Sequence, residues 1–172
     1  PSSGGRLDTL LLLNRDVLGA DGEGEIFDLI WDHAASYGPN RLLFGTRVHT
    51  TWGEPSLFDG LSALGGFTNL SGYRERQLLD QHSFLLRGIY YRRLGDDGRL
   101  FSVPAFVGGS LETGNIFATR DDLLDLDDLV LGGSLFVGVD SPLGPIFLGY
   151  GRNDDGESSV YLNFGSLQRP RL

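Results

Sequence analysis

The stretch that decides the fold is LVLGGSLFVGVDSPLGPIFLGYG, residues 129–151. Apolar side chains alternate with small or polar ones in its first half, and the alternation returns after a segment rich in proline and glycine. A period of two is the pattern of a β-strand with one apolar and one polar face. The stretch predicts a β-hairpin with strands at 129–140 and 145–151. Its turn is expected at Ser141, Pro142, Gly144 and Pro145.

The same period of two continues through the rest of the chain, whereas helical periodicity is weak. Most of the segments that carry it have ten or more residues, well above the usual strand length of about 5–6. A strand that crosses a bilayer at a tilt needs about 9–11 residues. Together with the hairpin, the pattern predicts an all-β protein of eight long antiparallel strands. The six further strands are expected at 7–18, 25–36, 41–52, 83–94, 100–117 and 158–167.

The two faces of these strands differ in polarity. In the strand at 25–36, Phe27, Leu29 and Trp31 share one face, and Asp28 and Asp32 share the other. An apolar outer face with a polar inner face is typical of a transmembrane β-barrel. A soluble sandwich or a lipocalin-like barrel would have the same alternation with its faces reversed, and alternation alone does not choose between them.

The lengths of the connections favour the membrane barrel. Short links alternate along the chain with longer ones at 19–24, 53–82, 118–128 and 152–158. Outer-membrane barrels have short periplasmic turns and longer external loops. With an even number of strands, both chain termini are then expected in the periplasm. We therefore predict a bacterial outer-membrane location, with outer-membrane lipid around the strands.

Composition excludes several other classes of protein. The net charge is −9, and all 14 basic residues are arginine, which argues against a nucleic-acid partner. The absence of cysteine excludes a disulfide framework and thiolate chemistry. The sequence has no apolar run of about 18 residues, as a membrane-spanning helix requires, and no signal peptide is recognised.

Three segments resemble the bacterial surface-antigen, or BamA-type, outer-membrane superfamily. Residues 131–145 resemble its penultimate hairpin, in which a strand runs into an S-P-x-G-P turn. Residues 106–115 resemble a strand with an inward acidic residue two before a glycine, and 160–165 resemble the closing strand. The resemblance implies a barrel that acts in protein translocation or insertion, or that anchors a secreted domain. A client or passenger protein would be its partner.

A fourth match lies in the long link, where GGFTNLSGY at 65–73 resembles an inward-folded loop tipped by V-R-G-F/Y. In the family the loop arginine reaches acidic residues on the barrel wall, and Glu112 occupies the matching wall position. Here Ser71, which cannot form a bidentate ion pair, replaces the arginine. Either Arg74 or Arg76 substitutes as the partner of Glu112, or Glu112 faces lumen water without a partner; we favour the paired form. The L-S-G-Y version is closest to the barrels attached to patatin-like phospholipases. The residues expected at the loop–wall contact are Gly72, Tyr73, Arg74, Arg76 and Glu112.

No catalytic residue, metal ligand or cofactor site is predicted, and the chain is not expected to be an enzyme. A patatin lipase carries its serine in G-x-S-x-G, and residues 60–64 fail this motif at the last position. His33, His49 and His82 lie on different segments without metal-ligand spacing. Asp28 and Asp32 would lie about 13 Å apart on one strand, too far for a glycosidase pair.

The number of strands leaves three alternatives, because the superfamily barrel has about sixteen and this chain supplies eight. The chain is a fragment, or it closes alone as a small barrel, or two copies pair edge to edge. We favour the homodimer, since open strand edges are not tolerated in lipid and a two-fold partner covers both. The alternatives in function are the membrane half of a patatin-type phospholipase and a soluble β-sandwich binding module. The expected parts are a tail at 1–6, a half-barrel at 7–167 and a tail at 168–172.

Overall fold

The computed structural model describes residues 3–14, 24–53, 60–94, 99–100, 103–124, 127–165 and 167. Strands account for most of them, and the one helical element is the short 3₁₀ turn η2, Asp121–Leu124. Among the described residues, no helix is long and apolar enough to cross a membrane. The strands are β1 (Gly4–Asn14), β2 (Gly24–Tyr37), β3 (Asn40–Gly53), β4 (Ser62–Leu64), β5 (Leu78–Asp80), β6 (His82–Arg93), β7 (Arg99–Leu100), β8 (Val103–Phe117), β9 (Val130–Ser141), β10 (Gly144–Asn153) and β11 (Ser158–Phe164).

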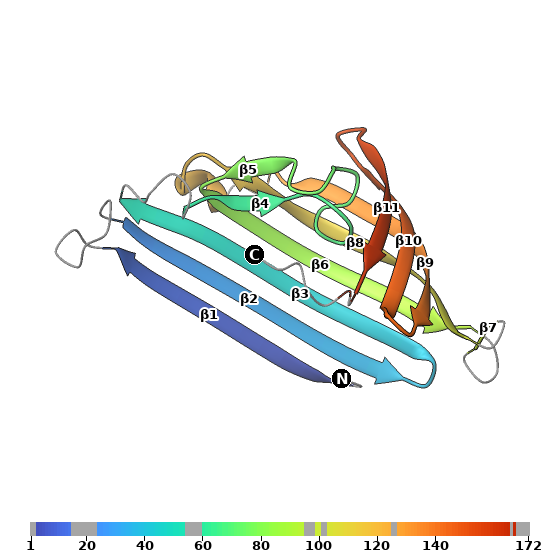
Figure 1. Ribbon diagram of the computed structural model, residues 1–172. Helices are drawn as coiled ribbons and strands as arrows, with labels where there is room; N and C mark the ends of the chain where they lie inside the picture. The colour runs from blue at the N-terminus through green and yellow to red at the C-terminus, as the bar shows by residue number, and fades with distance from the viewer. Residues whose placement is uncertain are drawn as a thin grey trace.

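Eight long strands form one antiparallel sheet in the order β1-β2-β3-β6-β8-β9-β10-β11, and β7 pairs beside β8. The prediction of an all-β, antiparallel fold is confirmed. The sheet is strongly curled, and β9, β10 and β11 rise at an angle to β1, β2 and β3 (Figure 1). Among the described residues, β1 and β11 each have one neighbouring strand. Both ends of the sheet are therefore open edges.

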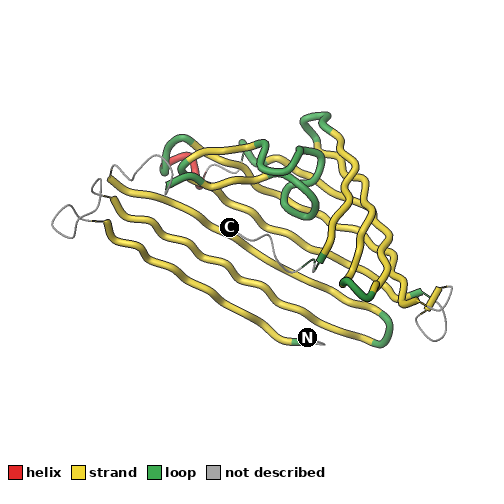
Figure 2. The backbone as a smooth tube through the Cα atoms, viewed as in Figure 1, coloured by secondary structure: helices red, strands yellow, loops and turns green. Residues whose placement is uncertain are grey.

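Residues 60–81, the described part of the connection between β3 and β6, lie over one face of the sheet, which we call the inner face (Figure 2). They carry the small β4–β5 pair, which was not predicted because three-residue strands have too little periodicity to detect. Residues 65–77, between β4 and β5, are the inward loop. It covers inner-face side chains of the strands that it contacts, such as Arg87 of β6 and Glu112 of β8.

The strand register confirms the predicted division of faces. Asp28 and Asp32 of β2 lie on the inner face, where Asp28 is 7% exposed. Trp31 lies on the opposite, outer face and is 38% exposed. The outer face of β9 is more exposed still, with Leu135 at 74%. Exposed leucine and valine side chains therefore lie on the outer face, whereas the inner face carries both polar side chains and a buried apolar cluster that includes Ile89, Phe136 and Phe147.

Several boundaries differ from the prediction. β1 begins at Gly4, so residues 4–6 pair with β2 and belong to the sheet, not to a tail. The predicted part 15–18 and the tail at 168–172 lie outside the described residues. β11 ends at Phe164, because Gly165 leaves the extended conformation with φ 111°. Leu167 then packs on the inner face.

The turn of the β9–β10 hairpin is shorter than predicted. Ser141 and Gly144 pair directly, which leaves two residues between the strands. The Ser141 hydroxyl donates to the Gly144 carbonyl at 2.7 Å, and Gly144 has φ 109°. Pro145 belongs to β10, where it lies opposite Asp140. Its assignment to the turn was wrong, because a proline at the start of a strand is compatible with pairing when its nitrogen is not needed as a donor.

Candidate functional site

The candidate site is the contact between the inward loop and the inner face of the sheet. The loop is compact, since Gly65 N–H donates to the Asn69 carbonyl at 2.7 Å and Asn69 N–H donates to Gly66. Thr68 and Leu70 have φ values of 58° and 76°, which are unfavourable for side chains with a Cβ. The surrounding contacts must therefore hold this conformation. Leu64, Leu70 and Tyr73 supply part of that support by packing on Leu85 and Val130.

Glu112 of β8 is the central wall residue of the site. It is 1% exposed, and its carboxylate accepts hydrogen bonds from the Ser71 N–H at 2.5 Å and from the Ser71 hydroxyl at 3.1 Å. A loop residue therefore does reach Glu112, but it does so with two neutral donors. Hydrogen bonds to a charged acceptor are about twice as strong as neutral ones, which favours this arrangement for a buried carboxylate.

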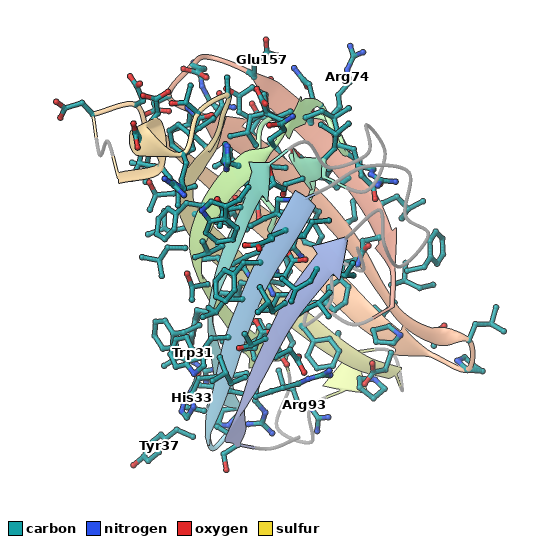
Figure 3. The ribbon with its side chains drawn as sticks, turned by 90° about the vertical axis from the view of Figure 1, so that its left-hand side faces the viewer. Trp31, His33, Tyr37, Arg74, Arg93 and Glu157 are labelled. Atoms are coloured by element: carbon teal, nitrogen blue, oxygen red, sulfur yellow. The ribbon has the colours of Figure 1, made fainter. Side chains whose placement is uncertain are left out.

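Neither of the two arginines predicted at this contact reaches Glu112. Arg74 and Arg76 are exposed, and neither makes an ion pair with Glu112. Arg74 projects from the end of the molecule where Glu157 also lies, opposite the end that carries Tyr37 and Arg93 (Figure 3). The expectation was wrong because the loop turns outward directly after Tyr73, so the two arginines leave the inner face.

Ser71 fits at Glu112 because the wall beneath it is made of glycine. A Cβ added to Gly132 would lie 2.7 Å from the Ser71 carbonyl oxygen, and one added to Gly151 would lie 2.7 Å from the Ser71 Cβ. Gly72 has φ 108°, and a Cβ there would meet the backbone nitrogen of Asn153 at 2.7 Å. Close approach of the loop thus explains the glycines at 132 in β9 and 151 in β10.

Arg87 of β6 forms a second contact with the loop. Its guanidinium donates to the Thr68 carbonyl at 3.3 Å and to the Asp32 carboxylate of β2 at 3.0 Å. β3 runs between β2 and β6, and its residue in this row is Gly45. A Cβ on Gly45 would lie 2.6 Å from Asp32 Oδ1 and 2.9 Å from Arg87 Nε. Glycine therefore permits an ion pair that passes over an intervening strand.

The C-terminal hairpin holds the tip of the loop. The Tyr161 hydroxyl accepts from Gly72 N–H at 2.8 Å and donates to the Tyr73 carbonyl at 2.7 Å. The Ser159 hydroxyl donates to the Gly72 carbonyl at 2.8 Å. The Tyr73 hydroxyl donates to the Asp155 carboxylate, in the β10–β11 connection. Burial, with Asp155 as a second cause, raises the pKa of the Tyr73 phenol.

Aromatic side chains fill the space between the loop and the C-terminal strands. Phe67 makes an edge contact with Phe136, with ring centroids 5.4 Å apart, and lies 5.6 Å from the Tyr161 ring. A Cβ on Gly149 would come within 2.7 Å of the Phe67 ring. Phe136 belongs to the apolar cluster that includes Leu167. The inner face is therefore polar around Glu112 and apolar toward the short-turn end.

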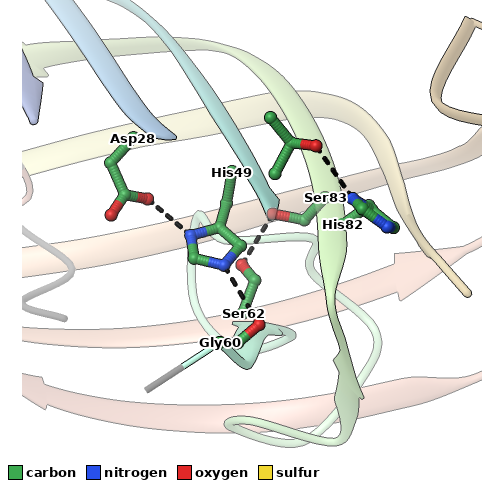
Figure 4. A network of polar contacts seen from close by, with 7 residues as sticks. Asp28, His49, Gly60, Ser62, His82 and Ser83 are labelled. Atoms are coloured by element: carbon green, nitrogen blue, oxygen red, sulfur yellow. Dashed lines mark hydrogen bonds and ion pairs between the residues drawn. The ribbon is translucent and has the colours of Figure 1, made fainter. Parts of the chain in front are cut away.

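A buried polar network connects residues 60–62, which precede the inward loop, to β2, β3 and β6 (Figure 4). His49 Nδ1 lies 2.6 Å from Asp28 Oδ1, and His49 Nε2 lies 3.3 Å from the Gly60 carbonyl oxygen. The hydroxyl of Ser62 lies 2.6 Å from that of Ser83. In this network the histidine is bonded to a carbonyl instead of a serine hydroxyl, so it does not form a nucleophilic triad.

Other chemistry at the site is limited. Among the described residues, no group of three or more histidine, cysteine, aspartate or glutamate side chains could hold a metal ion. The structure brings Gly72, Tyr73 and Glu112 together at the site, while Arg74 and Arg76 lie outside it. Sequence reasoning missed Ser71, Arg87 and Tyr161. Alternation places Arg87 and Tyr161 on the inner face, but it gives no sign of which loop atoms they meet.

Comparison with models of known protein families and with curated proteins finds no match to this chain.

Proposed function

We propose that this chain is one half of a bacterial outer-membrane β-barrel of the BamA-type superfamily, completed by a second copy. The barrel would translocate or insert client proteins, or anchor a secreted passenger domain. The observation that carries the proposal is the polarity of the sheet. Exposed leucine and valine side chains cover the outer face, whereas Asp32, Arg87 and Glu112 lie on the covered inner face. Lipid outside and a polar interior are the surroundings that such a sheet requires.

The open edges support the two-chain form. Within the described ranges, β1 (eleven residues) and β11 (seven residues) each pair on one side only, so the backbone groups on their other side have no strand partner. Each unsatisfied group costs several kcal/mol in hydrocarbon, so an open sheet does not persist there. A two-fold partner offers the complementary edge to each of them. The outer side chains of β1 are apolar as well, with Leu7 at 63% exposed and Leu11 at 60%.

The inward loop supports the anchoring role in particular. It is held by Arg87 at Thr68, by Glu112 at Ser71 and by Tyr161 at Gly72. These contacts join strands from both halves of the sheet through one loop. A barrel fixed in this way suits a stable support for an attached domain. If the attached domain were a patatin-type phospholipase, the catalytic serine would lie in that domain, in agreement with the absence of G-x-S-x-G here.

The test is the mass of the protein–detergent complex after the detergent mass is subtracted. Each chain has a mass of 18.8 kDa, and we expect twice this value. A mass of one chain would contradict the two-chain barrel. Monodisperse protein obtained from cells without any detergent would contradict the membrane location and favour the soluble binding module instead.

A further inference from the structure

We propose that the two open edges join in one defined register: β11 of one chain lies antiparallel to β1 of the other, with Val160 opposite the partner's Leu11. The same register places Asn163 opposite the partner's Asp8. This inference rests on the proposed function, because it describes the seam of the two-chain barrel. It goes further by assigning which residues meet.

The direction of pairing follows from the number of strands. Consecutive strands of the main sheet are antiparallel, so β1 and β11, the first and last of eight, run in opposite directions. A two-fold axis along the barrel leaves the direction of every strand unchanged in the partner. β11 therefore meets the partner's β1 in antiparallel orientation, and the second seam is identical to the first.

The alternation of faces restricts the register to steps of two residues. Side chains on the inner face must meet inner-face side chains across the seam. On β1 the inner residues have even numbers, as the pairing of Arg6 with Asp32 and of Leu10 with Asp28 requires. On β11 they have odd numbers, since Ser159 pairs with Gly151 and Tyr161 with Gly149. An odd-numbered residue of β11 must therefore lie opposite an even-numbered residue of the partner's β1.

The geometry of a sixteen-stranded barrel narrows the choice. A row of paired residues that is followed once around a closed barrel returns to its first strand shifted by a fixed number of residues, which we call the stagger. Strands that rise about 3.3 Å per residue, lie about 4.8 Å apart and tilt by about 35–45° require a total stagger of about 16–23 residues. Each chain then contributes about 8–12 residues of stagger. Only an even value satisfies the alternation.

The sheet itself shows its stagger. Gly4 of β1 is connected by successive strand pairs to Ser159 of β11. Gly4, the first residue of β1 (Gly4–Asn14), lies five residues from the central Thr9 toward the short-turn end. Ser159 lies two residues from Tyr161, the centre of β11 (Ser158–Phe164), toward the opposite end. Across seven strand steps the strands have therefore slipped by about seven residues. An eighth step of the same size gives about eight.

A stagger of eight per chain also pairs β11 along its whole length. Every residue of β11 then lies opposite a residue of the partner's β1 between positions 7 and 13. Val160 and Leu11 are 72% and 60% exposed on the outer face, so they form an apolar pair toward the lipid. Asn163 and Asp8 form a polar pair inside. A stagger of ten would place Asn163 opposite Leu10 and carry Ser158 beyond Asn14, the last residue of β1.

Disulfide trapping tests the register, and the chain has no cysteine of its own. Val160→Cys protein is refolded into detergent together with Leu11→Cys protein and is then oxidised. Directly opposite residues have Cα atoms about 4.5–5.5 Å apart, which lies within the range of about 4.4–6.8 Å that a disulfide spans. We expect a covalent dimer on a non-reducing denaturing gel. Matched controls combine Val160→Cys with Thr9→Cys or with Leu13→Cys, which test staggers of six and ten and should cross-link several-fold more slowly.

The outcomes separate this inference from the proposed function. Faster trapping with Leu13→Cys or Thr9→Cys overturns the register and leaves the two-chain barrel in place. No trapping at any position, in protein whose detergent-subtracted mass is that of two chains, also overturns the register. A chain that carries both Leu11→Cys and Val160→Cys provides the third arm. If its disulfide forms within one chain and the mass is that of one chain, both proposals fail.

Discussion

Arg87 and Glu112 occupy directly opposite positions on β6 and β8, yet the two described side chains form no ion pair with each other. Each reaches the inward loop instead: Arg87 donates to the Thr68 carbonyl, and Glu112 accepts from Ser71. Opposite charges at adjacent wall positions thus bind the two ends of one short loop segment. The segment from Thr68 to Ser71 is fixed by its backbone more than by its side chains.

Replacing Glu112 tests the neutral character of its contact. Glu112→Ala leaves the buried Ser71 N–H without an acceptor, which costs about 1–3 kcal/mol. Glu112→Gln keeps an acceptor oxygen, so we expect a smaller loss. The measurement is the temperature at which the folded band is lost on a semi-native gel. Equal losses for alanine and glutamine would mean that the negative charge itself is required.

Gly45 is expected to be sensitive to the smallest possible substitution. Gly45→Ala places a methyl group 2.6 Å from Asp32 Oδ1 and 2.9 Å from Arg87 Nε, which separates the ion pair. Overpacking of this kind costs about 1–3 kcal/mol. Gly88→Ala is the matched control, because its methyl group would meet only the Phe44 ring at an ordinary 3.7 Å. Similar unfolding temperatures for the two variants would contradict the role assigned to Gly45.

Substitution of the exposed arginines of the loop should have little effect, whereas substitution of the buried Ser71 should be destabilising. Arg74→Ala and Arg76→Ala remove exposed side chains without a described partner and should change stability by no more than about 0.5 kcal/mol. Ser71→Arg restores the loop arginine of the V-R-G-F/Y motif that the loop resembles. The site is bounded by Gly132 and Gly151 and has no room for an arginine side chain. We expect a clear loss of folded protein in refolding yield. A normal yield for Ser71→Arg would show that the loop moves to accept an arginine.

The phenol of Tyr73 should ionise at higher pH than an ordinary tyrosine. Burial raises its pKa, with Asp155 as a further cause, so the folded state favours the neutral phenol. Its stabilising contribution is present below about pH 10, the pKa of an unfolded tyrosine, and is lost as the pH rises toward the folded value. The difference in tyrosinate absorbance between wild type and Tyr73→Phe measures this ionisation. A difference centred near pH 10 would contradict the buried contact.

Much of the sheet could be predicted from the sequence because its strands are long and their faces differ. The alternation around Asp28 and Trp31 identified both the strand and its faces. The ends of the strands were predicted less well. The start of β1 at Gly4 was missed because glycine and arginine carry no alternation signal there. Pro145 was assigned to the turn because a proline usually marks one, whereas its register is fixed by pairing with Asp140.

The site was predicted only in part, because it depends on contacts far apart in the chain. Glu112 stood out as an acidic residue on an inner face, and the loop stood out by resemblance. Its partner could not be deduced, since the main donor is the backbone N–H of Ser71, which every residue except proline possesses. The bridge from Asp32 to Arg87 depends on Gly45, whose significance is visible only when three strands are aligned.

The contacts that hold the loop have a consequence for the order of folding. Gly72 meets Tyr161 across 89 positions of sequence, and Tyr73 meets Asp155 across 82. Such long-range pairs form late, because the entropy of closing a large loop is lost before they contribute. Gly72 and Tyr73 gain these contacts only when β10 and β11 have joined the sheet, whereas the contacts of Arg87 and Glu112 with the loop need only β6 and β8. A protein in which β10 and β11 have not yet joined the sheet would therefore expose Gly72 and Tyr73 to proteases, even with Ser71 bonded to Glu112.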